Sequence, residues 1–391
     1  MPCLLALQLL LLSGGCVEAA QPKVEADAAA ADTTPEKSAG SANSTTGTTS
    51  EQAPAEDLPH LSLDPQQELS RILFGSCAKQ NQPQPIWQAI LGRKPQVFLF
   101  IGDNIYGDTQ DMQELQQKWN LLGAQPGYRN LLETCPVLAT WDDHDYGADD
   151  AGRNYPKREE SQRVFLDFFG EPQDTARRKT PGVYDAKLVG PPGKQVQLIL
   201  LDTRYFRDDL VPGPPDVEPG EGISGRYRPN PDEEATILGE AQWNWLRQQL
   251  KQPVQLRVIA SSIQVLADGH GWESWSRFPH ERQRLLDAID SSAAGANVII
   301  SGDRHQAEIS QVTTASGRVV CDVTSSSLNA PGRWRNELNP HRLGVIYYAT
   351  NFGVIEVDWA ADDPVVRLQV CGEDGKVKLQ HRLPLSGFEP R

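Results

Sequence analysis

Acidic, phenolic, thiol and imidazole side chains recur in this sequence directly after short apolar runs, at four places along the chain. They are Cys77, Asp103, Tyr106, Asp142, Asp143, His144, Asp145, Asp303 and His305. Carboxylates and phenolates are hard oxygen donors, whereas imidazole and thiolate are borderline or softer ligands. This mixture suits a cluster of two or more metal ions, with one ferric-type ion and one divalent ion that prefers oxygen. The alternative is that the acids only cap helices.

The apolar runs before these residues predict strands whose ends meet. Residues 97–101 are five apolar residues in a row, as in a strand buried on both faces, and Gly102 ends the run. Ligands of open α/β sheets bind just beyond the carboxyl ends of the strands. Gly102-Asp103-Asn104 alone would also fit an ordinary polar turn. Because similar strand ends recur in a chain with only seven histidines, we favour a metal site.

The rest of the pattern alternates strands with helices and then ends in further strands. Predicted strands cover residues 72–74, 136–141, 196–201, 256–260, 298–301, 319–324, 353–358 and 365–370. Predicted helices cover residues 85–91, 112–122, 159–169 and 240–251, and the Pro-, Gly- and acid-rich residues 211–232 predict a surface excursion. This order predicts an α/β fold with a mixed sheet packed between helices.

The N-terminal residues 1–19 predict an export signal. They contain an apolar run, Leu4 to Leu12, that is too short to span a bilayer and is followed by small residues, although no Lys or Arg precedes it. An imperfect lipoprotein box leads to Cys16, so a lipid anchor there and cleavage near Ala19 both stay open. Residues 20–60 have almost no large apolar side chains and predict a disordered tether, which leaves residues 61–391 as the folded domain. We therefore expect export to the periplasm, the cell envelope or the medium.

Charge and cysteine content narrow the class of protein. The net charge of −15 argues against a nucleic-acid scaffold, which would present a basic face. It leaves an anionic substrate open, because bound metal ions reverse the sign of the field inside a site. The cysteine spacings match neither a zinc ribbon nor a dense disulfide framework, and pairing among Cys135, Cys321 and Cys371 is left open. The oligomeric state is open as well.

Five motifs, in this order along the chain, resemble the alkaline phosphatase D family over about Arg71 to Asp358. They are Gly75-Ser76-Cys77, Gly102-Asp103-Asn104-Ile105-Tyr106, Thr140-Trp141-Asp142-Asp143-His144-Asp145-Tyr146-Gly147, Leu201-Asp202-Thr203-Arg204-Tyr205 and Ser301-Gly302-Asp303-Arg304-His305. The combination is specific, although a single motif would not be. The resemblance implies a calcineurin-like metallophosphatase core, a four-layer αββα sandwich with mixed β-sheets. It also implies an exported hydrolase of small phosphate mono- and diesters.

The resemblance further implies the metals and their ligands. Ferric iron, Fe3+, would be held by Cys77, Asp103, Tyr106 and His305. Asp103 would bridge to calcium, Ca2+, whose ligands would be completed by Asp143 and Asp303. Relatives often have Asn at the position of Asp149, and this departure bears on which divalent ion the second position prefers.

Two residues would act on the substrate by the same resemblance. His144 would face the substrate phosphate as the catalytic group, stabilising the phosphoryl group or protonating the departing alkoxide. Its alternative role is to orient a neighbouring carboxylate. Arg204 would bind two phosphoryl oxygens with its planar guanidinium, a geometry that Lys cannot copy. Its alternative is a surface arginine paired with Asp208 or Asp209.

Two other classes of function compete with the hydrolase. One is a metal-stabilised protein that binds phosphate ligands on the same scaffold without turnover. The other is a structural envelope protein, which only the predicted tether supports. A complete set of metal ligands favours the enzyme, since a protein without catalysis has no need to keep all of them.

Overall fold

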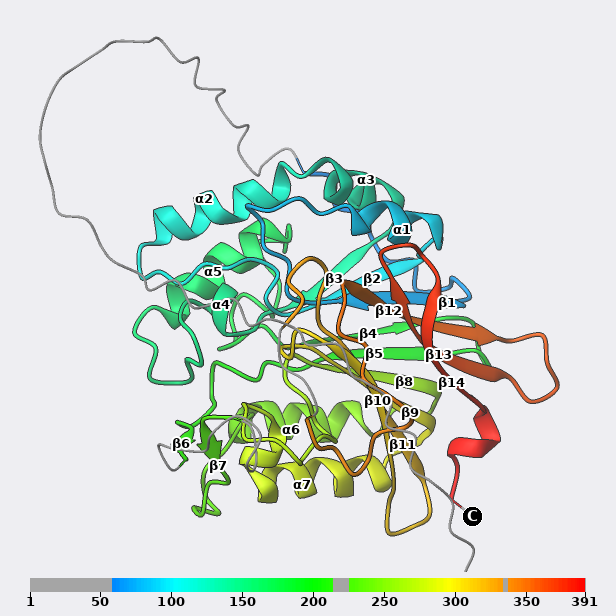
Figure 1. Ribbon diagram of the computed structural model, residues 1–391. Coiled ribbons are helices and arrows are strands. Elements are labelled where there is room, and N and C mark those ends of the chain that lie inside the picture. The colour runs from blue at the N-terminus through cyan, green and yellow to red at the C-terminus, as the bar shows by residue number, and fades with distance from the viewer. Residues whose placement is uncertain (1–57, 214–224, 333–336, 391) are drawn as a thin grey trace, which may run out of the picture. The chain divides into compact units, whose positions relative to one another are not determined.

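A computed structural model describes residues 58–213, 225–332 and 337–390 of the chain (Figure 1). The predicted signal, most of the predicted tether and Cys16 lie outside these residues. Within them, two six-stranded sheets carry the strand ends that the sequence singled out. No helix in these three ranges is both long and apolar enough to cross a membrane.

The first sheet has the strand order β14-β13-β12-β1-β2-β3. Its strands are β1 (Arg71–Gly75), β2 (Val97–Ile101), β3 (Val137–Thr140), β12 (Asn351–Asp358), β13 (Val365–Gly372) and β14 (Val377–Pro384). Parallel pairing joins β1, β2 and β3, with Phe74 opposite Leu99, and β12 joins β1 antiparallel. The carboxyl ends of these three parallel strands therefore lie at one edge.

The second sheet has the strand order β10-β11-β9-β8-β5-β4. Its strands are β4 (Asp185–Val189), β5 (Val196–Leu200), β8 (Val254–Ser261), β9 (Ala294–Ser301), β10 (Ala307–Thr313) and β11 (Val319–Ser325). Parallel pairing joins β5, β8, β9 and β11, while β4 and β10 are antiparallel edges. A short ribbon, β6 (Val211–Pro212) with β7 (Tyr227–Arg228), stands apart within the predicted surface excursion.

Helices cover the outer face of each sheet (Figure 1). The first sheet packs against α1 (Ile86–Gly92), α2 (Met112–Gly123), α3 (Pro126–Thr134) and α5 (Arg158–Phe168). The second packs against α6 (Gly239–Gln249) and α7 (Pro279–Asp290). The short segments α4 (Asp143–Tyr146), η2 (Trp275–Arg277) and η3 (Leu385–Phe388) complete the set. The layers follow the order helix, sheet, sheet, helix, which confirms the predicted αββα sandwich.

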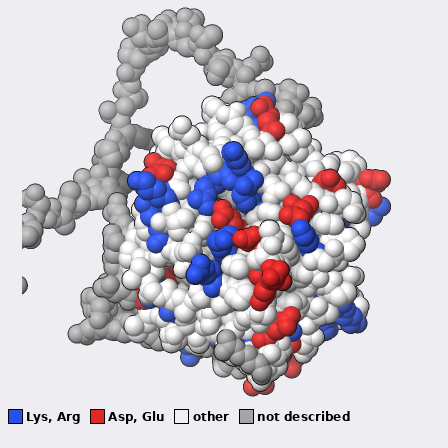
Figure 2. All heavy atoms as spheres, turned by 90° about the vertical axis from the view of Figure 1, so that its right-hand side faces the viewer, with Lys and Arg blue, Asp and Glu red and all other residues white. Residues whose placement is uncertain are grey.

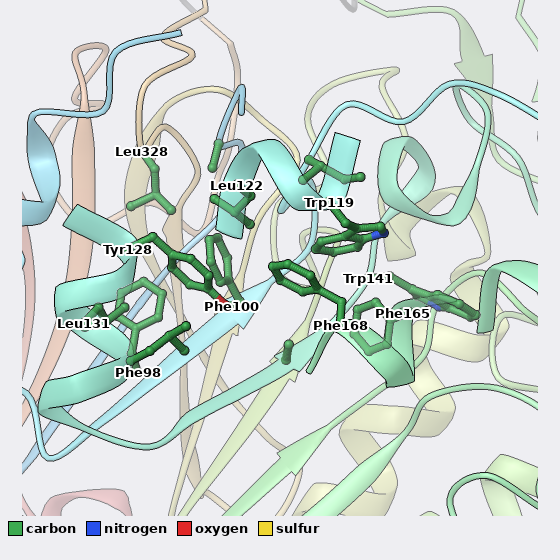
Figure 3. Packing of buried hydrophobic residues seen from close by; sticks show 14 of the residues in the cluster. Phe98, Phe100, Trp119, Leu122, Tyr128, Leu131, Trp141, Phe165, Phe168 and Leu328 are labelled. Carbon is green, nitrogen blue, oxygen red and sulfur yellow. The ribbon is translucent and has the colours of Figure 1, made fainter. Parts of the chain in front are cut away.

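Strand β2 shows how one sequence serves two apolar layers. Leu99 points into the cluster between the sheets, whereas Phe98 and Phe100 pack under the helices of the first outer layer. Figure 3 shows these two rings beside aromatic side chains of α2, α3 and α5, including Trp119 and Tyr128. Every residue of β2 is buried, as its unbroken apolar run predicts.

The sequence analysis did not predict several of the strands and helices. β10 and β14 lack a long apolar run, and β14 is an exposed edge strand whose apolar residues alternate with charged ones. α3 and α7 each have proline in the first turn, a usual position for it at a helix start. Those two helices therefore had a readable start signal, whereas the two strands had only weak alternation.

The right-hand face of the molecule in Figure 1 carries charged side chains of both signs. Figure 2 shows this right-hand face, where Lys and Arg alternate with Asp and Glu among uncharged residues. Mixed charges screen one another, so this face presents no extended field of one sign.

Candidate metal and substrate site

Loops that follow the parallel strands of both sheets bring the predicted residues together. Cys77 follows β1, and its Sγ lies 3.3 Å from Oδ2 of Asp103, which follows β2. The Thr140 hydroxyl at the end of β3 donates to the Leu201 carbonyl after β5 at 2.7 Å. This bond joins the two sheets at the edge where the strands end, so their loops form one site.

The first group of potential ligands is Cys77, Asp103 and His305, whose ligand atoms lie within 4.8 Å of one another. Tyr106 lies beside it, with its ring centroid 6.4 Å from that of His305. Two buried oxygens of this group have no hydrogen-bond partner, Oδ1 of Asp103 and the hydroxyl of Tyr106. An unpartnered buried polar atom is costly, and a bound cation would satisfy both. The donor set therefore fits a metal ion.

Two further groups share Asp103. One contains Asp143 and His144, and the other contains Asp142 and Asp303, each again within 4.8 Å. A carboxylate common to adjoining groups is suited to bridging two cations. The arrangement brings together all six residues predicted to bind metal, including Asp143 and Asp303 on the side rich in oxygen ligands.

The backbone at this site is unusual at four of the predicted ligands. Cys77, Asp103, Asp303 and His305 have φ values of 59°, 49°, 69° and 54°. Non-glycine residues avoid this left-handed region because the Cβ atom crowds the backbone. Such conformations persist where the surrounding structure fixes them, and they cluster at functional sites. Here they turn the side chains sharply out of the strand ends toward one another.

Burial and mutual repulsion alter the acidity of these groups. Burial, and then the neighbouring Cys77, raise the pKa of Asp103 well above its ordinary value. Burial also raises the pKa of the Cys77 thiol to about 11 and that of the Tyr106 phenol well above its ordinary value. These anions are thus unfavourable without a cation, which bound metal would supply.

His144 belongs to one of the ligand groups and is partly exposed to solvent. Its Nδ1 is 2.7 Å from Oδ1 of Asp108, and its ring centroid is 4.4 Å from that of Tyr106. Although burial opposes the charged imidazolium, the carboxylates of Asp143, Asp103 and Asp108 raise the pKa of His144 to about 11. The side chain is 19% exposed, so it can reach a molecule that arrives from solvent.

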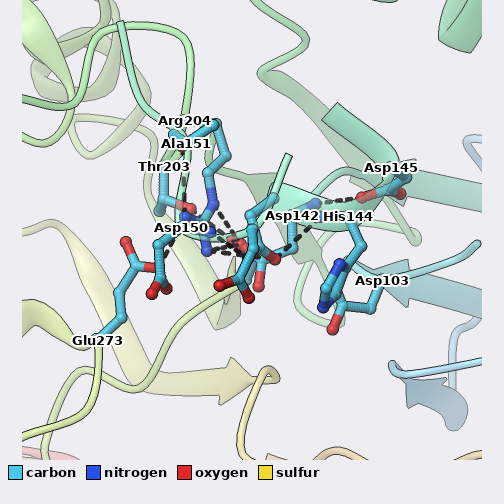
Figure 4. A network of polar contacts seen from close by, with 12 residues as sticks. Asp103, Asp142, His144, Asp145, Asp150, Ala151, Thr203, Arg204 and Glu273 are labelled. Carbon is cyan, nitrogen blue, oxygen red and sulfur yellow. Dashed lines mark hydrogen bonds and ion pairs between the residues drawn. The ribbon is translucent and has the colours of Figure 1, made fainter. Parts of the chain in front are cut away.

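Arg204 is fully buried and pairs with carboxylates other than those of Asp208 and Asp209 (Figure 4). Its Nε donates to Oδ1 of Asp142 at 2.6 Å, and its Nη1 lies 2.7 Å from Oε2 of Glu273. The alternative of a surface arginine is therefore wrong. Its Nη2 lies 3.8 Å from Oδ1 of Asp143, beside the predicted ligands. Nη2 also lies 2.5 Å from Oδ1 of Asp142, so all three guanidinium nitrogens contact carboxylates, and Nη2 is the one beside Asp143.

Sequence reasoning missed several residues of this site. Glu273 and Asp150 form a fourth group with Asp143, again within 4.8 Å. Glu273 stands in the segment Gly271-Trp272-Glu273, which follows no strand, so the strand-end rule could not find it. Asp108 and Ser326 contact His144 and Cys77, and only folding brings them there.

The structure also locates Asp149 and the three cysteines whose pairing the sequence left open. Asp149 is 60% exposed and pairs with Arg226 at 3.1 Å, whereas the neighbouring Asp150 lies in the cluster. The cysteines left open for pairing, Cys135, Cys321 and Cys371, are each buried and unpaired.

The fold and this cluster define a metallophosphatase-like α/β protein. The PhoD-like phosphatase family matches residues 72–380, and the chain belongs to that family. A segment of 188 residues is 25% identical to alkaline phosphatase D of Bacillus subtilis (strain 168). That match spans 44% of this chain and 31% of the relative, which is about a third of the relative's length.

Solved structures show the same fold at low sequence identity. A structure of PhoD has a TM-score of 0.61 and 16% identity, over 85% of this chain and 70% of that one. The purple acid phosphatase PPD1 from yellow lupin (Lupinus luteus) seeds has a TM-score of 0.57 and 13% identity, over 82% and 54%. GAP50, described as the anchor in the inner membrane complex of Plasmodium, has a TM-score of 0.50 and 15% identity, over 81% and 88%.

Proposed function

We propose that this protein is an exported, metal-dependent hydrolase of organic phosphate monoesters and diesters. The observation that carries the proposal is the carboxylate of Asp103, shared by three ligand groups, with a buried oxygen that no protein group satisfies. Phosphate esters carry negative charge that repels nucleophiles, so the site must neutralise charge and align the reactants. A cluster that holds cations meets the first need.

The donors divide into two kinds, which supports the expected pair of metals. A thiol, a phenol, an imidazole and a carboxylate come from Cys77, Tyr106, His305 and Asp103, and this set suits Fe3+. Only carboxylates come from Asp143 and Asp303, and these suit Ca2+ or another hard divalent ion. When bound, such metals would lower the pKa of a coordinated water and stabilise charge on the phosphoryl oxygens.

His144 and Arg204 would act on the ester itself. His144 is partly exposed and held by Asp108, so its ring is oriented to donate a proton toward the leaving group. Arg204 would donate to a phosphoryl oxygen from the second N–H of Nη2, since this nitrogen lies beside Asp143 and its 2.5 Å contact with Asp142 occupies at most one of its two N–H groups. Because its other N–H groups are occupied by protein, Arg204 would contact one phosphoryl oxygen rather than two.

A phosphate-binding protein without turnover is the second candidate. GAP50, which has a similar fold, is described as the anchor in the inner membrane complex of Plasmodium, so this fold also occurs in a protein described by a structural role. Against this candidate stands the completeness of the ligand groups in the present chain, from Cys77 to His305.

A single preparation separates the two candidates. The full chain is purified, its metals are measured by elemental analysis, and aryl phosphate and bis-aryl phosphate are assayed with and without calcium. Hydrolysis of either ester, absent in an Asp103→Asn variant, supports the hydrolase. Phosphate binding in a metal-loaded protein that turns over neither ester would favour the binding protein.

Export and lipid attachment need a separate experiment. Cell fractionation of the full chain is expected to place it outside the cytoplasm. If Cys16 carries a lipid, Cys16→Ala should move the protein from the membrane fraction to the soluble exported fraction. Retention of the full chain in the cytoplasm would contradict the export proposal.

A further inference from the structure

Four buried charges form a chain beside the metal-ligand cluster, and Figure 4 labels three of them, Asp142, Arg204 and Glu273. They are Asp142, Arg204, Glu273 and Arg207, each at most 2% exposed. Glu273 stands between the two arginines, with Oε2 2.7 Å from Nη1 of Arg204 and Oε1 2.9 Å from Nε of Arg207. Neither carboxylate oxygen of Glu273 has a hydrogen bond outside these two ion pairs. The position of this side chain therefore depends on the arginines, and theirs depends on it.

Both arginines also bind the loop that carries Asp143 and His144. Arg204 donates from Nη1 to the Ala151 carbonyl at 3.4 Å. Arg207 donates from Nη2 to the Asp150 carbonyl, and its own carbonyl accepts from the Arg153 amide at 2.8 Å. Glu273 thus links the 271–274 segment to the loop after β3 through two guanidinium groups.

The geometry decides which nitrogen of Arg204 faces the site. Oδ1 of Asp142 lies 2.6 Å from Nε and 2.5 Å from Nη2, and Glu273 holds Nη1. Nη2 carries a second N–H beyond its contact with Asp142, and this nitrogen lies 3.8 Å from Oδ1 of Asp143. A guanidinium is planar, and fixing two of its three nitrogens fixes the third. Without Glu273, Nη1 would keep only its 3.4 Å bond to the Ala151 carbonyl in a dry environment, so the guanidinium would be free to turn toward another acceptor.

We propose that Glu273 is a positioning residue for the phosphoryl group, acting through Arg204. It holds the guanidinium so that Nη2 points at the place where a phosphoryl oxygen would lie. This inference rests on the proposed hydrolase function and adds to it a residue that contacts no substrate. A purely structural ion pair would instead stabilise the fold without affecting phosphate affinity.

The test compares Glu273→Gln with a matched control, Glu281→Gln. Glu281 is also a carboxylate only 2% exposed, and it accepts from Trp243 Nε1 at 2.9 Å and from the Ile237 amide at 2.8 Å, on α7. Inorganic phosphate is the probe, as a competitive inhibitor of aryl phosphate hydrolysis. For each variant the inhibition constant, KM, kcat, metal content and Tm are measured.

Glu273→Gln is expected to weaken phosphate inhibition about tenfold to a hundredfold with metal content retained, as loss of one aligned charged hydrogen bond would. Glu281→Gln is expected to lower Tm and leave the inhibition constant unchanged. In an Arg204→Lys background, Glu273→Gln should add little, because the group it positions is gone. If Glu273→Gln fails to fold, Glu273→Asp keeps the charge one methylene shorter and should shift the inhibition constant in the same direction.

Two results would overturn the inference, and they differ from failure of the hydrolase proposal. A Glu273→Gln protein with parental inhibition constant and KM but lower Tm would make the ion pairs structural only. Full additivity of the Glu273 and Arg204 changes would show that Glu273 does not act through Arg204. Absence of hydrolysis in the metal-loaded parent would instead remove the proposed function itself.

Discussion

Two halves of the site satisfy their buried polar groups in opposite ways. The ligand half leaves oxygens without partners and bends its backbone into the left-handed region, and it consists of Cys77, Asp103, Tyr106 and His305. The ion-pair half neutralises each charge with another protein charge, and it consists of Asp142, Arg204, Arg207 and Glu273. The first half is arranged for a charge that the protein does not itself supply, whereas the second compensates its charges within the protein, although Oδ2 of Asp142 has no hydrogen-bond partner.

This difference indicates how the two halves share the work. Buried ion pairs add little net stability, because desolvation offsets the attraction, but breaking one leaves an unpaired charge at high cost. The ion-pair half is therefore suited to fixing geometry. Burial raises the pKa of Asp103, Cys77 and Tyr106 in the ligand half, and that of Asp142 and Glu273 in the ion-pair half. The arginines oppose the shift in the ion-pair half, whereas the ligand half depends on a cation for the same compensation.

The largest effect should come from removing metal from the ligand half. Chelation is expected to lower hydrolysis of aryl phosphate by roughly a thousandfold, about 4 kcal/mol, because the clustered carboxylates would then repel the substrate. The assay is paired with elemental analysis, and adding back iron and calcium should restore the rate. Full activity in a sample confirmed to be empty would refute metal dependence and with it the contrast between the halves.

Breaking the ion-pair half should cost both rate and stability. Arg204→Ala leaves the Asp142 carboxylate buried without its ion-pair partner and leaves Glu273 with Arg207 alone, at about 3–5 kcal/mol of unfolding free energy. Loss of its contact with the phosphoryl group should slow turnover about a hundredfold. Urea unfolding and kcat measure the two effects separately.

Arg204→Lys is the control for this change. It keeps the charge but cannot hold both carboxylates and the phosphoryl oxygen together, so it should recover only part of each loss. Turnover of the Arg204→Ala protein within a few-fold of the parent would mean that Arg204 does not contact the phosphoryl group.

The sequence predicts the ligand half and the ion-pair half of the site to different extents. The sequence predicted that the members of the ligand half meet, because each follows an apolar run that ends at one sheet edge, and the structure brings them together. That they bind metal stays a prediction. For Arg204 the strand end predicted the place but not the partners, since Asp142 comes from the other sheet and Glu273 from a loop. Ion pairs between segments 60 or 70 residues apart leave no local pattern, so only the folded structure reveals them.

The sheet topology was predictable to a similar degree. Apolar runs located the central strands, but the antiparallel edge strands β4, β10 and β14 were missed. β4 and β14 are largely half-exposed or exposed, and the apolar pattern of β10 is broken by the buried polar residues Glu308 and Ser310. Site residues on central strand ends were thus easier to find than contacts contributed by loops.

Replacing Cys77, the predicted sulfur ligand, should change the iron content without changing the fold. Cys77→Ser is expected to lower iron content roughly tenfold or more, since even the loss of an outer partner of a ligand can cost that much. The fold should survive, because the hydroxyl fits the space of the thiol. Tyr106→Phe should bleach any visible phenolate-to-iron absorption. Cys321→Ser, a buried cysteine outside the site, should leave iron content unchanged; equal iron in the Cys77 variant would make Cys77 a core residue only.

The smallest effect is expected at the edge of the ion-pair half, where Asp149 meets Arg226. Both side chains are more than half exposed, at 60% and 57%, so water and salt screen their 3.1 Å contact. Asp149→Asn, which restores the residue that relatives often have, should change unfolding free energy by less than about 1 kcal/mol. Because Asp150 rather than Asp149 lies with Asp143 and Glu273, activity with calcium should change little. Titrating activity with calcium and with magnesium tests this expectation. A reversed preference for the two ions in Asp149→Asn would show that Asp149 reaches the second metal in the loaded protein. Asp149 would then belong to the site despite its exposed position.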